Sequence, residues 1–444
     1  MSRSRLLTRP ALALLAAAIV SALPGLAAAQ NLQELVEAAR SYDATFRAAQ
    51  AAAQSAEFRA AQAEALGRPS AALTASAGTS ASDSSRTAGT LQATTLQAGV
   101  NGRYPLFNRS NDATMAQARK ALDLAKAELD TAEQDLIIRV SQAYFDVLTA
   151  ENSLSAVRAN KAFITEQLAS ARRNFEVGTA TITDTREAQA RFDLATAQEI
   201  AAENDLRTKR IALDQVVGRG NVSPRGLVKA ATLPAPQPAD AETWASQADS
   251  GHPSVRKARL GLDVARLETE KARAAESFTL DAVGSVGSTH FGGKGATLPG
   301  QNTSTSVGLQ LNWPLYTGGA TQNRIKETLA LEDKSRNDLD AARRAVTQAT
   351  RQAFFGVQSG LAQVKALEAA ESSSQLALEA TQLGYKVGVR VNLDVLNAQT
   401  QLFQTRRDLA KARYDVILGG LKLRLASGQL KPVDVAAVNA LLER

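Results

Sequence analysis

Two ten-residue segments combine a glycine with side chains that can form hydrogen bonds and ion pairs. YKVGVRVNLD, residues 385–394, offers a tyrosine hydroxyl, an arginine guanidinium and a carboxylate. FEVGTATITD, residues 175–184, has the same Val-Gly core and the same final aspartate but no arginine. Taken alone, both fit an ordinary turn, with a glycine that ends a helix and an aspartate that caps the next one. Their chemistry is reversible bonding, and the question is why only one copy carries an arginine.

No other part of the sequence suggests catalysis. The chain has no cysteine, which excludes disulfides and thiolate chemistry. Its two histidines, His252 and His290, lie far apart, and we expect His290 to be solvated near a loop. There is no Ser/His/Asp set, glycine-rich phosphate loop or cluster with metal-ligand spacing, and no basic run for nucleic acid. The sequence therefore predicts a protein that is not an enzyme and uses no cofactor, metal or nucleic acid.

Residues 1–29 have the pattern of a secretory signal peptide. Arg3, Arg5 and Arg9 precede the apolar run ALALLAAAIV, and small residues surround a cleavage point after Ala29. Without these three arginines, the 51 basic residues fall to 48, against 44 acidic residues. That mild excess of positive charge identifies no partner. No later segment offers 18 consecutive apolar residues, so no membrane-spanning helix is predicted.

The chain is an internal duplication. QAYFDV at 142–147 recurs as QAFFGV at 352–357, an offset of 210 residues. The same offset relates Val177-Gly178 to Val387-Gly388, Asp184 to Asp394, Leu213 to Leu423, and Gly218 to Gly428. The predicted units are 30–218 and 251–428, joined by a proline-containing connector at 219–250 and followed by a C-terminal segment at 429–444.

Each unit is predicted to be mostly helical. The expected helical runs are 31–66, 110–173 and 183–217 in the first unit, and 252–276, 320–384 and 392–426 in the second. The longest runs exceed 60 residues, which corresponds to about 95 Å of helix. Leucine and alanine recur every three or four positions between 122 and 140, as in a coiled-coil seam. A rod-like scaffold would explain the helices alone equally well.

Two strand-like segments interrupt the helices of each unit. They are predicted at 70–81, 90–104, 278–291 and 303–316. In the last of these, Leu309 and Leu311 alternate with Gln310, as in a transmembrane β-strand. A half-buried strand in a soluble sheet would show the same alternation. Four strands cannot close a barrel, and an open edge in lipid leaves backbone groups unpaired, so a membrane location requires an oligomer.

Several motifs give the chain a family resemblance. They are AYFDVL at 143–148, RNFEVGTATITD at 173–184, WPLYTGG at 313–319 and GYKVGVRVNLDVLNAQT at 384–400. Together with the duplication, they make nearly all of 30–430 similar to the TolC-type outer-membrane efflux and secretion channels. The resemblance implies a mainly α fold with a membrane β-barrel. Three chains would form a twelve-stranded barrel in the outer membrane of a Gram-negative bacterium. An α-helical barrel would continue it into the periplasm, with the connector and the C-terminal segment forming an equatorial region.

The resemblance also suggests a role for the arginine of the second turn. In the family, a tyrosine and an arginine hold the periplasmic tip closed, and they correspond to Tyr385 and Arg390. Their bonding partners would be Asp184 and Thr183, with Gln167 in a supporting position. The arginine is then needed once, because one helix pair moves and the other receives it.

A charged ring at the pore tip is the second implied feature. Asp394 matches the family's ring aspartate, whereas the second ring position holds Asn397 in place of an aspartate. A trimer would then carry three ring carboxylates instead of six, and block by cations should be weaker. The family's glutamate near the tyrosine is replaced by Gln382, which removes one expected gate contact.

Two functions from different classes fit these features. The first is the exit duct of a tripartite efflux pump or type I secretion system, conducting small molecules or polypeptides. Its partners would be a periplasmic adaptor, an inner-membrane RND or ABC transporter, and outer-membrane lipid. The second is a periplasmic coiled-coil adaptor or scaffold without a channel. The alternating strands and the absence of a lipid-attachment cysteine favour the first.

Overall fold

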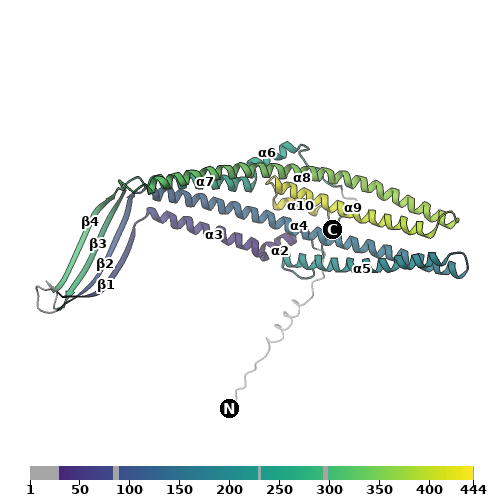
Figure 1. The fold of residues 1–444 in the computed structure, drawn as a ribbon, viewed down its shortest axis with the longest axis horizontal. Coiled ribbons are helices and arrows are strands. Elements are labelled where there is room, and N and C mark those ends of the chain that lie inside the picture. Colours follow the sequence, from purple (N-terminus) through teal and green to yellow (C-terminus); the bar gives the residue numbers. More distant parts are fainter. Residues whose placement is uncertain (1–29, 84–89, 229–231, 294–298, 444) are drawn as a thin grey trace, which may run out of the picture.

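The computed structural model describes residues 30–83, 90–228, 232–293 and 299–443. Long helices run from a curved β-sheet at one end to two turns that connect helices at the other (Figure 1). The predicted signal peptide lies outside the described residues, as do parts of both predicted hairpin loops and of the connector. None of the described helices combines the length and apolarity that a membrane-crossing helix needs.

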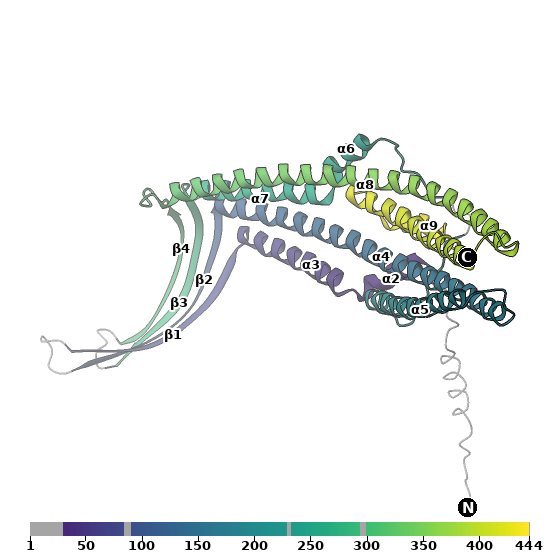
Figure 2. The same ribbon diagram turned by 45° about the vertical axis from the view of Figure 1, so that its right-hand side comes forward.

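The sheet contains four antiparallel strands in chain order, β1 (Ser70–Ser82), β2 (Leu91–Phe107), β3 (Thr279–Gly292) and β4 (Gly300–Asn312). Strands β2 and β3 come from different repeats and pair along most of their length. This leaves β1 and β4 as the two edges. All four strands curve together away from the helices (Figure 2).

The fourth strand differs from its prediction at 303–316. It begins at Gly300 and ends at Asn312, because Pro314 has no N–H for the ladder. The chain then turns through Gly318 and Gly319, which have φ of 61° and 83°. Trp313, which follows the strand, packs edge-on against Phe278 with ring centroids 6.3 Å apart. The alternation of apolar and polar residues in the sequence therefore extends past the end of the strand, to Trp313, which packs beside the sheet without pairing in it.

The first predicted helix, 31–66, is two helices. They are α2 (Leu32–Tyr42) and α3 (Ala44–Glu64), followed by the short 3-10 turn η2 (Ala65–Gly67). The break falls at Asp43, whose carboxylate accepts a hydrogen bond from the Phe46 N–H at 2.8 Å and two from Arg139, at 2.9 and 3.0 Å. The hydrogen bonds from Arg139 keep the pKa of Asp43 below its ordinary value. A long-range ion pair therefore divides a run that its local sequence predicts to be continuous.

The remaining long helices follow the predicted order. They are α4 (Arg109–Glu176), α5 (Ile182–Val217), α7 (Pro253–Ala274), α8 (Ala320–Lys386) and α9 (Asn392–Ala426). Helix α3 packs along α4, and α7 packs against both α8 and α4. The pairs α4/α5 and α8/α9 run to the tip (Figure 1). Gly218 and Gly428, which end α5 and α9, have φ of 73° and 71°, so the repeat extends to the backbone conformation.

The main apolar core lies midway along the molecule. Tyr144 and Phe145 of the QAYFDV motif are buried there, and the Tyr144 hydroxyl donates to the Arg225 carbonyl at 2.8 Å. Burial raises the pKa of Tyr144, which keeps its hydroxyl a donor. Two short helices flank this region, α6 (Ala241–Gly251) and α10 (Pro432–Asn439). The sequence predicted only a connector where α6 forms.

Candidate gate at the helical tip

The two turns at the tip share one backbone arrangement. Gly178 and Gly388 both have φ of 79°, a conformation that favours glycine. At the end of α4, in the first helix pair (α4/α5), the amides of residues 179 and 180 donate to the Asn174 carbonyl at 2.8 and 3.1 Å. In the second pair, residues 389 and 390 donate to the Gly384 carbonyl at 2.9 and 3.1 Å. These bonds satisfy carbonyls that the helix end leaves free, so both helices end in the same hydrogen-bonded turn.

The first turn uses its aspartate locally. The Thr181 side chain accepts from the Asp184 N–H at 3.2 Å, and the Asp184 carboxylate accepts from the Thr181 N–H at 3.0 Å and from its hydroxyl at 2.8 Å. This is a reciprocal capping box at the start of α5. Asp184 is therefore already bonded within its own turn.

The second turn leaves its aspartate without such a cap. Val391 occupies the position of Thr181, and no side chain caps the start of α9. The Asp394 carboxylate instead lies 3.6 Å from the guanidinium of Arg390. The stem of Arg390 crosses Gly384, since a Cβ built on that glycine would lie 2.8 Å from the Arg390 Cγ. The missing threonine and the small Gly384 together place the arginine against the aspartate.

Few polar contacts join the two helix pairs near the tip. The Asn174 side-chain amide donates to the Tyr385 hydroxyl at 3.4 Å, and Arg191 donates to the Asn397 side chain at 2.9 Å. Leu396 packs in an apolar cluster with Ala188 of the first pair. Sequence reasoning missed Asn174 and Arg191. The repeat could have identified Asn174, because it lies in the RNFEVGTATITD motif, 210 residues before Gly384. No local pattern identifies Arg191.

The structure brings only part of the predicted site together. Tyr385 reaches the first helix pair, but it bonds Asn174 instead of Asp184 or Thr183. Arg390 pairs with Asp394 on its own helix pair. Within the described chain, Thr183 is exposed and Gln167 is half-buried on α4, and neither side chain makes a hydrogen bond to another described residue. A single chain therefore shows the tyrosine contact between the helix pairs and an arginine that pairs with Asp394 on its own pair.

An unusual residue begins α9. Asn392 is 3% exposed, yet neither of its side-chain amide atoms has a hydrogen-bond partner among the described residues. Its repeat counterpart, Ile182, is 49% exposed. The Thr185 hydroxyl on α5 is likewise buried and unpaired. Buried polar groups without partners destabilise the packing around them, so the tip carries a weak point.

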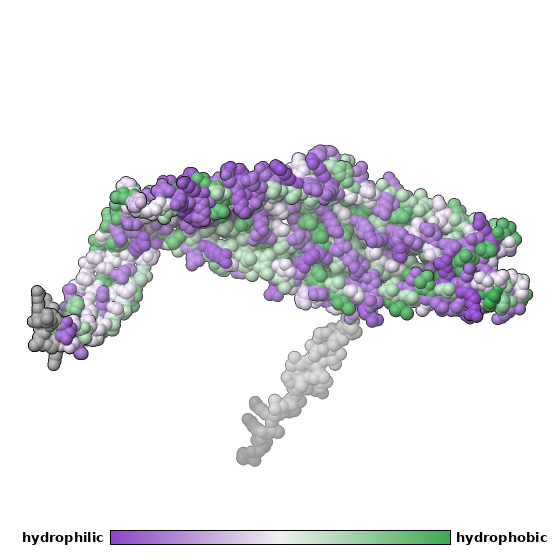
Figure 3. All heavy atoms as spheres, in the orientation of Figure 1, coloured by the Kyte–Doolittle hydropathy of each residue, from purple (hydrophilic) through white to green (hydrophobic). Residues whose placement is uncertain are grey.

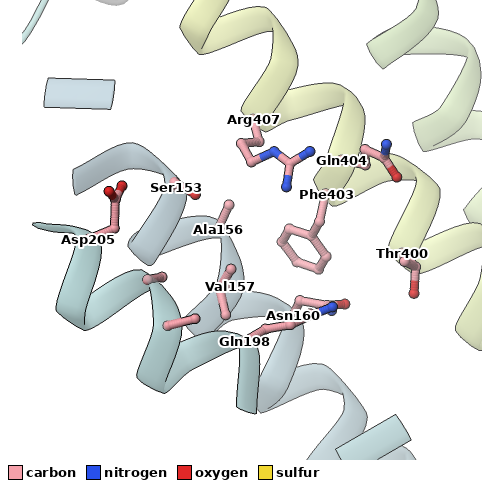
Figure 4. Close-up of a pocket in the computed structure, with 12 residues that line it drawn as sticks. Ser153, Ala156, Val157, Asn160, Gln198, Asp205, Thr400, Phe403, Gln404 and Arg407 are labelled. Carbon is pink, nitrogen blue, oxygen red and sulfur yellow. The ribbon is translucent and has the colours of Figure 1, made fainter. Parts of the chain in front are cut away.

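A hollow separates the helix pairs between the main core and the tip (Figure 4). Its volume is about 390 Å³, and residues of α4, α5 and α9 line it. Phe403 projects from α9 toward Val157 and Asn160 on α4, and Arg407 of the same helix also lines the hollow (Figure 4). Packing between the pairs is therefore interrupted here, between the tip contacts and the main core, where Asn152 of α4 donates to the Tyr414 hydroxyl of α9 at 2.7 Å.

The sheet has one apolar and one polar face. Val307, Leu309 and Leu311 are 89%, 70% and 60% exposed on one face of β4. On the other face, polar side chains bond across strands, as Asn101 does with Thr74 at 3.2 Å. Hydrophilic residues are dense along α8 and sparse over most of the visible sheet (Figure 3). An exposed apolar face on a two-edged sheet is what lipid contact and oligomerisation would cover.

Neither histidine belongs to a reactive cluster. His252 is the N-cap of α7, where its Nδ1 accepts from the Ser254 N–H at 3.0 Å, and burial lowers its pKa. His290 is exposed near the end of β3, on the strand and not in the loop. Within the ranges that the structure describes, no three His, Cys, Asp or Glu side chains are grouped to hold a metal ion.

Comparison with known proteins supports this architecture. The family model "Outer membrane efflux protein" matches residues 35–219 and 244–429, one match in each repeat. Outer membrane protein TolC of Vibrio cholerae is 35% identical over 348 residues, covering 78% of this chain and 79% of that protein. Alkaline protease secretion protein AprF of Pseudomonas aeruginosa is 32% identical, covering 76% and 70%.

Solved structures show the same fold. The outer membrane protein VceC of Vibrio cholerae matches with a TM-score of 0.77 and 21% identity, over 89% of this chain and 96% of that one. The CmeC outer membrane channel of Campylobacter jejuni matches with a TM-score of 0.79 and 15% identity, over 93% and 90%. The predicted fold class, mainly helical with four strands in two repeats, is confirmed. The chain therefore belongs to the outer membrane efflux protein family and is a TolC-type outer-membrane efflux and secretion channel, a transporter and not an enzyme.

Proposed function

We propose that three copies of the chain form the gated exit duct of a tripartite efflux pump or type I secretion system. Family membership implies a trimeric channel that works with efflux pumps. The observation that carries the proposal is the four-stranded sheet with unpaired edges at β1 and β4 and an exposed apolar face. Pairing β4 of one protomer with β1 of the next would satisfy both edges and close twelve strands into a barrel. The scaffold alternative leaves this face without a role.

The duct would conduct passively, with its energy and cargo supplied by partners. We assign these as a periplasmic adaptor and an inner-membrane RND or ABC transporter. The relatives support both uses, because one is an outer membrane TolC and another is an alkaline protease secretion protein. The connector and the C-terminal segment, with α6 and α10 midway along the long helices, would form the equatorial region of this assembly.

The gate would be the interface between the two helix pairs. Tyr385 already spans it through Asn174, and we propose that Arg390 leaves Asp394 to bond Asp184 and Thr183 when three protomers close the tip. Gln167 would support the tyrosine from α4. The polar weak point at Asn392 and the hollow above the tip support a second pair that can move. Asp394 and Asn397 would face the narrowed pore, where a ring of side chains sets ion passage.

A matched pair of variants tests the barrel. Leu309 lies on the apolar face, and Leu309→Arg should destabilise membrane insertion by roughly 2–4 kcal/mol per chain near the bilayer midplane. Gln310→Arg, one residue along on the polar face, should leave the yield of outer-membrane trimers intact. Equal trimer yields from both variants in membrane extracts would contradict a lipid-facing Leu309.

A further inference from the structure

The four strands carry only two fixed charges, and these charges meet. Arg103 on β2 and Asp281 on β3 are the only Lys, Arg, Asp or Glu residues within the four strands. The Arg103 Nη2 lies 2.6 Å from the Asp281 Oδ2. Because β2 and β3 belong to different repeats, the ion pair bridges the joint between the two hairpins.

Both side chains lie on the polar face of the sheet. Arg103 is two residues from Asn101, and Asp281 is opposite Gln310 on β4. Alternation therefore places both on the side away from Leu309 and Leu311. A charge on the lipid face would be strongly unfavourable, so the pair faces the lumen of the barrel. Its position near the helical ends of β2 and β3 puts it at the barrel base.

The two side chains of the pair differ in how far they are exposed. The Asp281 side chain is 7% exposed, whereas the Arg103 side chain is 58% exposed. The second carboxylate oxygen of Asp281, Oδ1, is buried without a hydrogen-bond partner among the described residues. A hollow of about 360 Å³ adjoins the arginine, with small residues such as Ser70, Gly102 and Ser306 in its wall. Arg103 is the only charged residue in that wall.

We propose that three Arg103 guanidinium groups form an electropositive ring at the barrel base, which attracts anions and the carboxylate or phosphate groups of passing cargo. Asp281 is a positioning residue that holds each guanidinium toward the lumen from behind. The positive end of each pair faces the pore, so the local potential is positive although the pair is neutral overall. The ring rests on the proposed trimer, and its sign is opposite to that of the Asp394 ring at the tip.

The decisive variant removes both charges together. Arg103→Gln alone would leave a buried carboxylate without its partner and weaken assembly. The double variant Arg103→Gln/Asp281→Asn keeps the net charge of the chain and a polar side chain at both positions, and Asn has the same size as Asp. In planar bilayers under a KCl gradient, its cation-to-anion permeability ratio should rise by about twofold or more. A double variant with the wild-type ratio would overturn the proposal.

Two further variants separate an electrostatic role from a structural one. Arg103→Lys keeps the charge and should keep the wild-type ratio. Asp281→Asn keeps the arginine, removes its counter-charge and should lower the ratio; a rise would contradict the assignment. Inorganic triphosphate should reduce wild-type current and leave the double variant unaffected, and equal block of both would also contradict it. Wild-type protein that forms no channels would refute the proposed trimeric duct, whereas gated wild-type channels with unaltered variant ratios would refute only the arginine ring.

Discussion

The two turns at the tip have the same backbone and different side-chain bonding. Both pass through a glycine at φ 79° and return their amides to the same carbonyl position. In the first, Thr181 and Asp184 bond each other and close the cap. In the second, the Val391 side chain cannot bond Asp394, and the aspartate carboxylate meets Arg390 instead. The duplicated turn is capped by its own side chains in the first copy and carries an uncapped aspartate paired with an arginine in the second.

A few side-chain differences give the two copies different contacts while their backbone fold stays the same. With valine in place of threonine, the second helix has no side-chain cap, and the Asp394 carboxylate is left to pair with Arg390. Glycine at 384, where the first turn has Asn174, makes room for the arginine stem. Asn174, in turn, supplies the amide that the Tyr385 hydroxyl accepts. Asn174 therefore contributes to the contact between the helix pairs, whereas Val391 and Gly384 shape the Arg390–Asp394 pair within the second one.

Removing the proposed gate contacts should have the largest effect. Arg390→Ser with Tyr385→Phe eliminates the guanidinium and the tyrosine hydroxyl while keeping the glycine turn. In the proposed closed trimer, the helix pairs would then lose the charge-assisted bonds of Arg390 and the neutral bond of Tyr385, and single-channel conductance should rise several-fold, because charge-assisted bonds are the stronger type. Trimer yield should be unchanged, and large antibiotics should enter.

The control lies on the first turn. Arg186 is a nearby arginine of the first pair without an assigned tether, and Arg186→Ser should leave conductance at the resting level. If Arg186→Ser opens the channel as far as the double variant, the effect is a general loosening of the tip, and the assignment of Arg390 and Tyr385 fails.

The buried asparagine offers the reverse experiment. Asn392→Ile places at the second turn the residue type that the first turn has at Ile182. Removing two unpaired buried polar atoms should stabilise the packed tip by about 1–3 kcal/mol, and open probability should fall by tenfold or so. Ile182→Asn is the matched control at an exposed position and should change little. A rise in open probability for Asn392→Ile would show that the amide finds partners in the closed trimer.

The two turns should also differ in the charge that they present to the pore, because Asp394 is the proposed ring aspartate. Asp394→Asn should reduce block by multivalent cations, because three carboxylates no longer face the narrowed pore. Asn397→Asp should strengthen the block by restoring a second ring. Unaltered block in Asp394→Asn would place the constriction elsewhere.

The smallest effect should come from the cap itself. Val391→Thr gives the second turn the capping box of the first and should stabilise the start of α9 by about 0.5–2 kcal/mol. Amide hydrogen exchange in the first turn of α9 should slow accordingly. Thr181→Val should speed exchange at the start of α5 by a similar factor. No change in either helix would mean that trimer contacts, and not the caps, hold these ends.

Much of the architecture could be predicted from repetition and periodicity. The offset of 210 residues relates Gly218 to Gly428, and the structure gives them nearly the same φ. The helices around 142–147 and the alternation at Leu309 and Leu311 depend on local patterns, which a single sequence displays. The break at Asp43 and the helix α6 could not be found this way, because a distant arginine and tertiary packing determine them.

The candidate site could be predicted by residue type more than by partner. Family motifs identified Tyr385, Arg390 and Asp394 as tip residues, and the structure places them together at one turn. The partner of Tyr385 in this chain is Asn174, because Asp184 is held by Thr181. Long side chains such as Arg191 bridge helices over distances that sequence spacing does not encode.

If the pore opens because the two helix pairs move apart, a cross-link between the pairs should keep it closed. Arg191 and Asn397 bond across the interface and are accessible, and the chain has no cysteine of its own. We would introduce Arg191→Cys and Asn397→Cys into the Arg390→Ser/Tyr385→Phe variant and record single channels before and after a short bismaleimide. We expect high single-channel conductance before cross-linking and a return to the resting level afterwards. High conductance that persists in fully cross-linked trimers would contradict it, because the pore would then open without separation of the two helix pairs.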